Sequence, residues 1–308
     1  MAVEAPGKSD SWLVRRIGEG RRAVEDDAAA DGIGRGWAWA GFWLPMAGLA
    51  GLGVVFVVHR IWYYDVQLED RPVEWAQFAM CLFSGIAFAL AGVRFGRRGQ
   101  AGPAVLLLLV ALGSLGLAGE EISWGQRVFG VVTPAELAGV NEQAEMNVHN
   151  IDTGIPSEAL FKIFAFAMGL GGAGLALLLR RPGRPVGRPS WWLVAPPLLA
   201  VPGFVGMALY RVFMLFAPVI DPVVAGQEWI EAGLYGSLAV TAGCCWARSA
   251  PGRYDLRDGA TGRPTAPATS INRLPLGLAA AGVLALTVVF DVMTAHSGVL
   301  PGNLPGHS

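Results

Sequence analysis

Two adjacent carboxylates, Glu120 and Glu121, lie in the densest polar segment of the chain, G-E-E-I-S-W-G-Q-R at 119–127. In a low dielectric, neighbouring carboxylates repel, so that one of them tends to hold a proton or to bind a cation. A general acid or base is often made in this way. If a helix runs through the segment, Glu120, Trp124 and Arg127 share a face. The segment predicts an acid–base site; the alternative is an interfacial tryptophan beside a solvated charge pair.

A second polar segment, 141–150, places Asn141, Glu145 and His149 one helical turn apart. A carboxylate and an imidazole at this spacing can bind a metal or form an acid–base dyad. We interpret Glu145 and His149 as candidate ligands of a divalent metal. The alternative is a capped amphipathic helix at the surface. The position of the segment directly after the Glu-Glu pair favours the functional interpretation.

These two segments resemble those of an uncharacterised group of bacterial multi-pass membrane proteins that share an E-E-x-S-W-G-Q-R sequence. The resemblance implies no activity. The Glu-Glu pair before Arg127 is also similar to that of CAAX-type intramembrane proteases, but the two histidine motifs of that family have no counterpart here. The chain also lacks the HxxxH that ceramidase-like and progestin-receptor-like hydrolases carry in their last span.

The elements that must position these residues are transmembrane helices. Of the 308 residues, 53% are hydrophobic and 15% are charged, whereas a typical soluble domain has about 25% charged residues. A spanning helix needs roughly 20 mostly apolar residues, and seven segments qualify: 36–58, 73–95, 103–124, 158–179, 191–220, 227–247 and 274–295. The predicted fold class is therefore an all-α polytopic membrane protein with about seven transmembrane helices. Prolines 196, 197 and 202 predict a kink or an interfacial turn in the fifth span.

The distribution of arginines predicts the orientation. They concentrate in the N-terminal segment and in every second connection, and short basic loops stay in the cytoplasm. The N-terminus is therefore expected inside and the C-terminus outside the plasma (inner) membrane. The expected parts are a partly disordered cytoplasmic polar tail (1–35), a transmembrane domain (36–295) with a polar outer loop (120–157) and a flexible cytoplasmic loop (248–273), and an external tail (296–308).

With this topology, the ionisable residues gather at the outer boundary. Charged groups at membrane depth are costly and usually face a bundle interior or a wet cavity. We therefore expect a polar cavity that opens outward. The residues expected to contribute to it are Glu74, Glu120, Glu121, Glu228, Glu231 and Asp291.

Three classes of function remain open. The leading hypothesis is a membrane-embedded hydrolase or transferase that acts on a lipid or lipid-linked substrate. Glu120 or Glu121 would be its acid–base residue, and Arg127 would hold an anionic head group. An ion-coupled transporter is the first alternative, although no acids line the cytoplasmic half of the predicted spans. A structural or assembly subunit is the second. Membrane lipids are the expected partners, and the net charge of −1 gives no basic field for nucleic acid.

Overall fold

The computed structural model describes residues 12–67, 72–129, 131–135, 157–180, 190–216 and 220–251, together with Ala285 and Val288. All regular elements in this part of the chain are helices. The long ones are α1 (Trp12–Ala30), α2 (Arg35–Val58), α4 (Pro72–Gly96), α5 (Ala101–Glu121), α8 (Ser157–Leu179), α9 (Val201–Phe216) and α11 (Gln227–Arg248). The short ones are α3 (Arg60–Asp65), η1 (Ser123–Gly125), α6 (Gln126–Phe129), η3 (Ser190–Leu193), η4 (Leu198–Ala200) and α10 (Asp221–Ala225).

Five stretches of the described chain are long and apolar enough to cross a membrane: Arg35–Val58, Pro72–Gly96, Ala101–Glu121, Ala159–Leu179 and Leu198–Phe216. For the described residues, the predicted all-α fold is thus confirmed, as is the presence of helices long and apolar enough to cross a membrane. α11 has 22 residues but carries Glu228, Glu231 and Arg248, and it is not among the five. Most of the predicted seventh span lies outside the described residues.

The fifth predicted span begins irregularly, as its prolines indicate. The chain passes through η3, the Pro196-Pro197 pair and η4 before α9 starts at Val201. Proline lacks the amide hydrogen that a helix interior needs. α9 is therefore shorter than the predicted segment.

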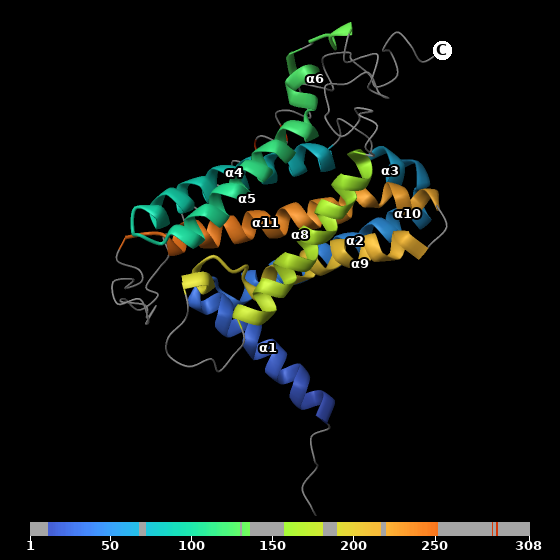
Figure 1. Cartoon of the computed structure of the whole chain (residues 1–308). Coiled ribbons are helices and arrows are strands. Elements are labelled where there is room, and N and C mark those ends of the chain that lie inside the picture. The colour runs from blue at the N-terminus through green and yellow to red at the C-terminus, as the bar shows by residue number, and fades with distance from the viewer. Residues whose placement is uncertain are drawn as a thin grey trace, which may run out of the picture.

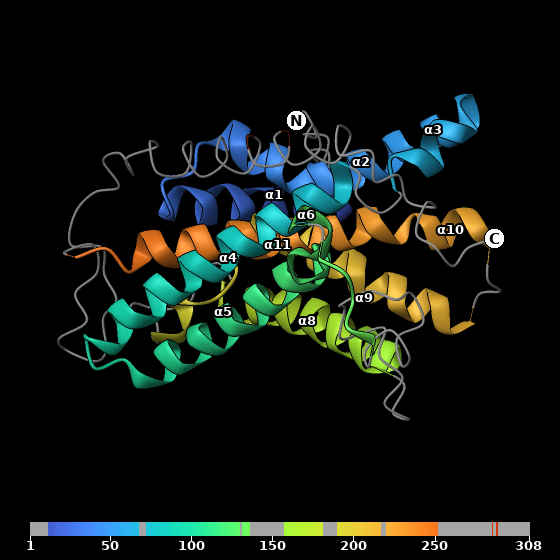
Figure 2. The ribbon, with the colours of Figure 1, turned by 90° about the horizontal axis from the view of Figure 1, so that it is seen from above.

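The helices pack in the order α5, α4, α11, α9, α8, with α2 against α9 and α11. Figure 1 shows α4, α5 and α11 running side by side. Seen from above in Figure 2, α11 lies between α2 on one side and α8 and α9 on the other. Neighbouring helices thus cover α11, and a helix covered by protein can carry polar side chains that a lipid-facing helix would not.

Small residues let the helices approach closely, as is common in membrane bundles. Gly85 and Gly92 of α4 lie against α5. A Cβ on Gly85 would come within 2.6 Å of Leu115, and one on Gly92 within 2.9 Å of Leu108. The tight packing of α4 on α5 therefore depends on these two glycines.

Gly203→Ala in α9 is expected to destabilise the crossing of α9 and α11 by about 1–3 kcal/mol, the usual effect of overpacking. The new Cβ would lie 2.2 Å from the Gly233 carbonyl oxygen and 2.2 Å from Ser237 Oγ, both on α11. Gly206→Ala is the matched control, because its Cβ would meet only Met46, at 3.7 Å. Thermal unfolding in detergent measures the difference. Equal midpoints for the two variants would contradict the tight crossing.

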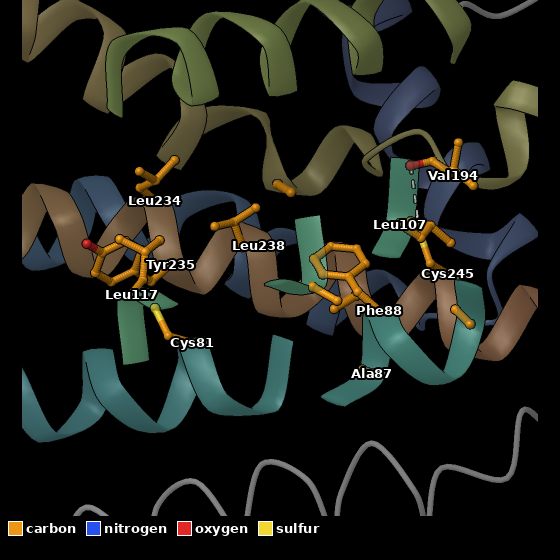
Figure 3. Close-up of a cluster of buried hydrophobic side chains, with 14 of the residues drawn as sticks. Cys81, Ala87, Phe88, Leu107, Leu117, Val194, Leu234, Tyr235, Leu238 and Cys245 are labelled. Carbon is orange, nitrogen blue, oxygen red and sulfur yellow. Dashed lines mark hydrogen bonds between the residues drawn. The ribbon is translucent and has the colours of Figure 1, made fainter. Parts of the chain in front are cut away.

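The core between α4, α5 and α11 is apolar over most of its length. Figure 3 shows Phe88, Leu107 and Leu238 in the middle of this cluster, with Cys81 and Tyr235 toward one end. Toward the other end, the Cys245 thiol donates a hydrogen bond to the Val194 carbonyl oxygen at 3.6 Å. The residues that carry charge thus lie beyond this core, at the two ends of the bundle.

A buried network of two arginines and two aspartates joins α1 to the bundle. Arg248, at the end of α11, forms a bidentate pair with Asp31, at 2.8 Å through Nε and 2.6 Å through Nη2. Arg180, which follows α8, donates to Asp27 at 2.6 Å and to Asp31 at 3.2 Å. Both guanidinium groups lie over the Trp192 ring, 4.4 and 5.4 Å from its centroid. We call these four charged residues the α1 network.

Backbone groups complete the α1 network. Arg180 and Arg248 both donate to the Ala195 carbonyl oxygen, at 3.1 and 2.8 Å. Burial raises the pKa of Asp27 while the charge of Arg180 opposes that shift, so the aspartate charge depends on this arginine. The prediction of a partly disordered tail is wrong for residues 12–30. These residues form helix α1, and Asp27 within it pairs with Arg180, a residue 153 positions further along the chain.

Acid is expected to loosen the contact between α1 and α2. Glu25 accepts a hydrogen bond from Trp39 Nε1 at 2.9 Å and pairs with Arg21 at 3.1 Å and Arg35 at 2.9 Å. The Trp39 hydrogen bond and then Arg21 hold the pKa of Glu25 below its ordinary value of 4.5. The stabilisation is therefore present above that value and is lost as the pH falls through the folded-state pKa.

The thermal midpoint of the wild type should accordingly exceed that of Glu25→Gln near neutral pH. The gap should close as the pH falls below the ordinary pKa of Glu25, 4.5. A gap that does not change with pH would contradict this role of Glu25.

Candidate functional site

The Glu-Glu segment ends helix α5, and three residues with a left-handed backbone follow it. The backbone angle φ is 46° at Ser123, 54° at Trp124 and 82° at Gly125. In the described chain, the first two are the only non-glycine residues with positive φ. Such conformations cost on the order of 1–3 kcal/mol each and cluster at functional sites. α5 therefore stops at Glu121, not at Trp124 as predicted, and α6 leads away from the bundle (Figure 1).

Glu120 contacts Trp124 even though the helix does not continue. The indole Nε1 donates to Glu120 Oε1 at 2.7 Å. Gly119 makes room for the ring, because a Cβ there would lie 3.0 Å from three atoms of Trp124. Trp124 is exposed, so the Glu120 carboxylate is held at the edge of the bundle. The predicted third member of this face, Arg127, has a side chain outside the described part of the structure.

Glu121 faces the bundle interior. Its carboxyl group is hydrogen-bonded to the hydroxyl of Tyr235, a buried residue of α11. Three more carboxylates lie close enough to act on its charge, those of Glu231, Glu74 and Glu228 in decreasing order of effect. The end of α5 thus meets the beginnings of α4 and α11. We call Glu74, Glu121, Glu228 and Glu231 the acidic cluster.

Gln77 of α4 joins α4 to α11 beside the acidic cluster. Its Nε2 donates to the Glu228 carbonyl oxygen at 2.6 Å and to Glu228 Oε2 at 3.2 Å. The side chain is fully buried, and within the described residues its Oε1 has no hydrogen-bond partner. Leaving a buried acceptor unsatisfied costs about 1–3 kcal/mol. A water molecule or a polar group of a substrate would satisfy this oxygen.

Glu231 is paired with an arginine. Arg211 of α9 donates through Nη2 to Glu231 Oε1 at 2.8 Å, and both side chains are buried. Gln227 donates to the same oxygen at 2.9 Å and accepts from Arg211 Nη1 at 3.1 Å. The charge of Glu231 is therefore compensated, whereas a neutral hydroxyl contacts Glu121. Neighbouring carboxylates in unlike environments are the arrangement that separates acid from base roles.

Sequence reasoning missed three members of this site: Gln77, Arg211 and Tyr235. Each had a signal. An arginine such as Arg211 inside a spanning helix is rare and usually functional. Tyr235 lies one helical turn after Glu231, and Gln77 lies one turn after Glu74.

The structure brings together Glu74, Glu121, Glu228 and Glu231. Glu120, next to Glu121 at the end of α5, contacts Trp124 instead. The other predicted site residues, Glu145, His149 and Asp291, lie outside the described residues. Within the residues that the structure describes, no group of three or more His, Cys, Asp and Glu side chains could hold a metal ion. The metal hypothesis therefore rests on Glu145 and His149 alone.

Neither a family model, nor a curated protein, nor a solved structure matches the chain. Its class is therefore defined by the fold and the site. In the described residues it is an α-helical protein with five helices long and apolar enough to cross a membrane and an acidic cluster at one end of its bundle.

Proposed function

We propose that the chain is a membrane-embedded hydrolase or transferase that acts on a lipid or lipid-linked substrate. The observation that carries the proposal is the environment of Glu121. This carboxyl group ends an apolar spanning helix, is hydrogen-bonded to a buried tyrosine and lies among three further carboxylates. A carboxyl group in such surroundings is suited to exchange protons with a substrate.

Glu121 is the acid–base residue in this proposal. It takes the proton of the attacking hydroxyl group, which belongs to water in a hydrolase and to the acceptor in a transferase. It then returns the proton to the leaving oxygen. Tyr235 orients the carboxyl group, and the Gln77 Oε1 accepts a hydrogen bond from the substrate. Arg211 keeps Glu231 charged, so that the two carboxylates take different roles.

The lipid substrate class follows from the position of the acidic cluster. Glu121 is the last residue of a helix that is long and apolar enough to cross a membrane. A cluster at such a helix end lies near the head-group level. A molecule with an apolar tail and a polar head can reach it from the bilayer, whereas a fully polar molecule reaches it only from the water phase.

The finer topology is also part of the proposal. We place α11 as a sixth crossing and residues 274–295 as a seventh, with the N-terminus inside and the acidic cluster at the outer leaflet of the plasma membrane. The alternation of basic connections supports this orientation. In this arrangement, Glu145 and His149 would bind a divalent metal, and Arg127 would hold the anionic head group of the substrate. Asp291 would line the polar cavity.

The test is lipid turnover in proteoliposomes. Purified wild type is reconstituted into a bacterial polar lipid extract, and the lipids are measured by mass spectrometry over time beside Glu121→Gln. We expect the wild type to consume at least one lipid species that Glu121→Gln does not consume. Identical lipid profiles for the two proteins would refute a lipid-directed enzyme.

An ion-coupled transporter is a second candidate, and one observation favours it. Asp27 and Asp31 are buried at the end of the bundle opposite the acidic cluster, so α11 has ionisable groups near both of its ends. Both aspartates are paired with arginines, which makes them less suited to carry protons. Proton or cation uptake into the same proteoliposomes, abolished by Glu121→Gln without lipid turnover, would replace the enzyme proposal by this one.

A further inference from the structure

An apolar groove opens between α1, α2 and α8, at the end of the bundle opposite the acidic cluster. Its volume is about 720 Å³, within the range of sites for small molecules. Its walls include Ile17 and Gly20 of α1, Trp39 and Trp43 of α2, and Leu177 of α8. Ile17, Trp43 and Leu177 are 63%, 55% and 49% exposed. The groove is therefore open, and its apolar walls are only partly covered by protein.

Positive charge borders this groove. Arg21 is one of its lining residues, and Arg35 reaches the same carboxylate, Glu25, that Arg21 contacts. One carboxylate thus faces two guanidinium groups, which are 55% and 60% exposed. The nearby aspartates of the α1 network do not offset this excess, because Arg180 and Arg248 already pair with them.

We propose that the groove binds one acyl chain of an anionic phospholipid, with the lipid phosphate at Arg21 and Arg35. α2 and α8 are long and apolar enough to cross a membrane, so lipid chains reach the groove from the side. The apolar walls suit a hydrocarbon chain, and a guanidinium group can bind two oxygens of one phosphate at once. This site is separate from the acidic cluster and independent of the proposed function.

The wall residue Gly20 provides the first test. A Cβ on Gly20 or on Gly18 would have nothing within 4 Å, so Gly20→Trp and Gly18→Trp add the same bulk to open space on the same helix. Only Gly20 lines the groove. Phosphatidylglycerol and phosphatidylcholine with identical acyl chains are titrated into the detergent-purified protein, and bound lipid is counted by native mass spectrometry. Gly20→Trp should bind phosphatidylglycerol about tenfold more weakly than wild type, equivalent to about 1.4 kcal/mol, and Gly18→Trp should bind it like wild type.

Two further comparisons make the outcome decisive. Leu177→Trp fills the groove from α8 and leaves the sequence of α1 unchanged. It should therefore weaken phosphatidylglycerol binding as Gly20→Trp does, which excludes a distortion of α1 as the cause. Arg21→Gln should weaken phosphatidylglycerol severalfold, whereas Arg22→Gln, beside it and outside the groove lining, should not. Unchanged phosphatidylglycerol binding in both Gly20→Trp and Leu177→Trp would overturn the site. Equal binding of the two lipids by wild type would overturn its preference for an anionic head group.

Discussion

Replacing Arg248 with methionine is expected to destabilise the protein by about 3–5 kcal/mol, the usual effect of breaking a buried ion pair from one side. The arginine is fully buried, pairs with Asp31 through two hydrogen bonds and donates to two backbone carbonyl oxygens, those of Leu193 and Ala195. Methionine fills a similar volume but leaves the carboxylate with Arg180 as its remaining cation. The protein should unfold at a markedly lower temperature in detergent, followed by tryptophan fluorescence.

Arg94→Met is the matched control for this prediction. Arg94 lies in the last turn of α4, is only partly buried, and has its guanidinium group 5.8 Å from the centroid of the Trp246 ring. Its loss should change the midpoint little. The double variant Arg248→Met, Asp31→Leu removes both charges and should recover part of the stability, because neighbouring sites couple. If Arg248→Met unfolds at the same temperature as Arg94→Met, the α1 network does not stabilise the fold.

In the proposed enzyme, Glu121→Gln is expected to lower lipid turnover by a factor of about 10²–10⁴, the usual contribution of a general acid or base. Glutamine preserves the size of the side chain and can still accept the Tyr235 hydrogen bond, but it cannot exchange a proton. The fold should therefore persist, as judged by the thermal midpoint. Tyr235→Phe should reduce the rate by a smaller factor, because the carboxyl group remains while its orientation is lost.

Glu120→Gln separates the roles of the two adjacent carboxylates. Its side chain is held by the exposed Trp124, so this variant should keep most of the activity. Equal loss in Glu120→Gln and Glu121→Gln would indicate that the pair acts as one unit. Full activity in Glu121→Gln would remove the acid–base role from this residue.

The long apolar helices were largely predictable because they satisfy the same physical rule, which the polar helix α1 does not. Arg35–Val58, Pro72–Gly96 and Ser157–Leu179 begin and end within about one residue of the predicted spans. Hydrocarbon requires long apolar segments with internally bonded backbones, and this requirement is visible in composition alone. The end of α5 was mispredicted because Ser123 and Trp124 adopt positive φ, which neither residue type favours.

The acidic cluster was partly predictable. Its carboxylates are visible as charges in or beside apolar segments, and alternating crossings bring the end of α5 to the beginnings of α4 and α11. The partners of these carboxylates depend on which faces of the helices meet. The contacts of Glu121 with Tyr235 and of Glu231 with Arg211 are set by the packing of α11 against its neighbours. Hydropathy does not contain that information.

The pairing of Asp31 with Arg248 has a consequence for how the chain is made. The two residues are 217 positions apart, and ribosomes add about 5–20 residues per second. Asp31 therefore waits roughly 10–40 s for its bidentate partner while every intervening helix is synthesised and inserted. Helix α1 can meet α2 early, through Glu25, Trp39 and Arg35, but the α1 network is complete only once α11 has been made. A late rise in the protection of α1 from a protease during synthesis would report that α11 has taken its place at the centre of the bundle.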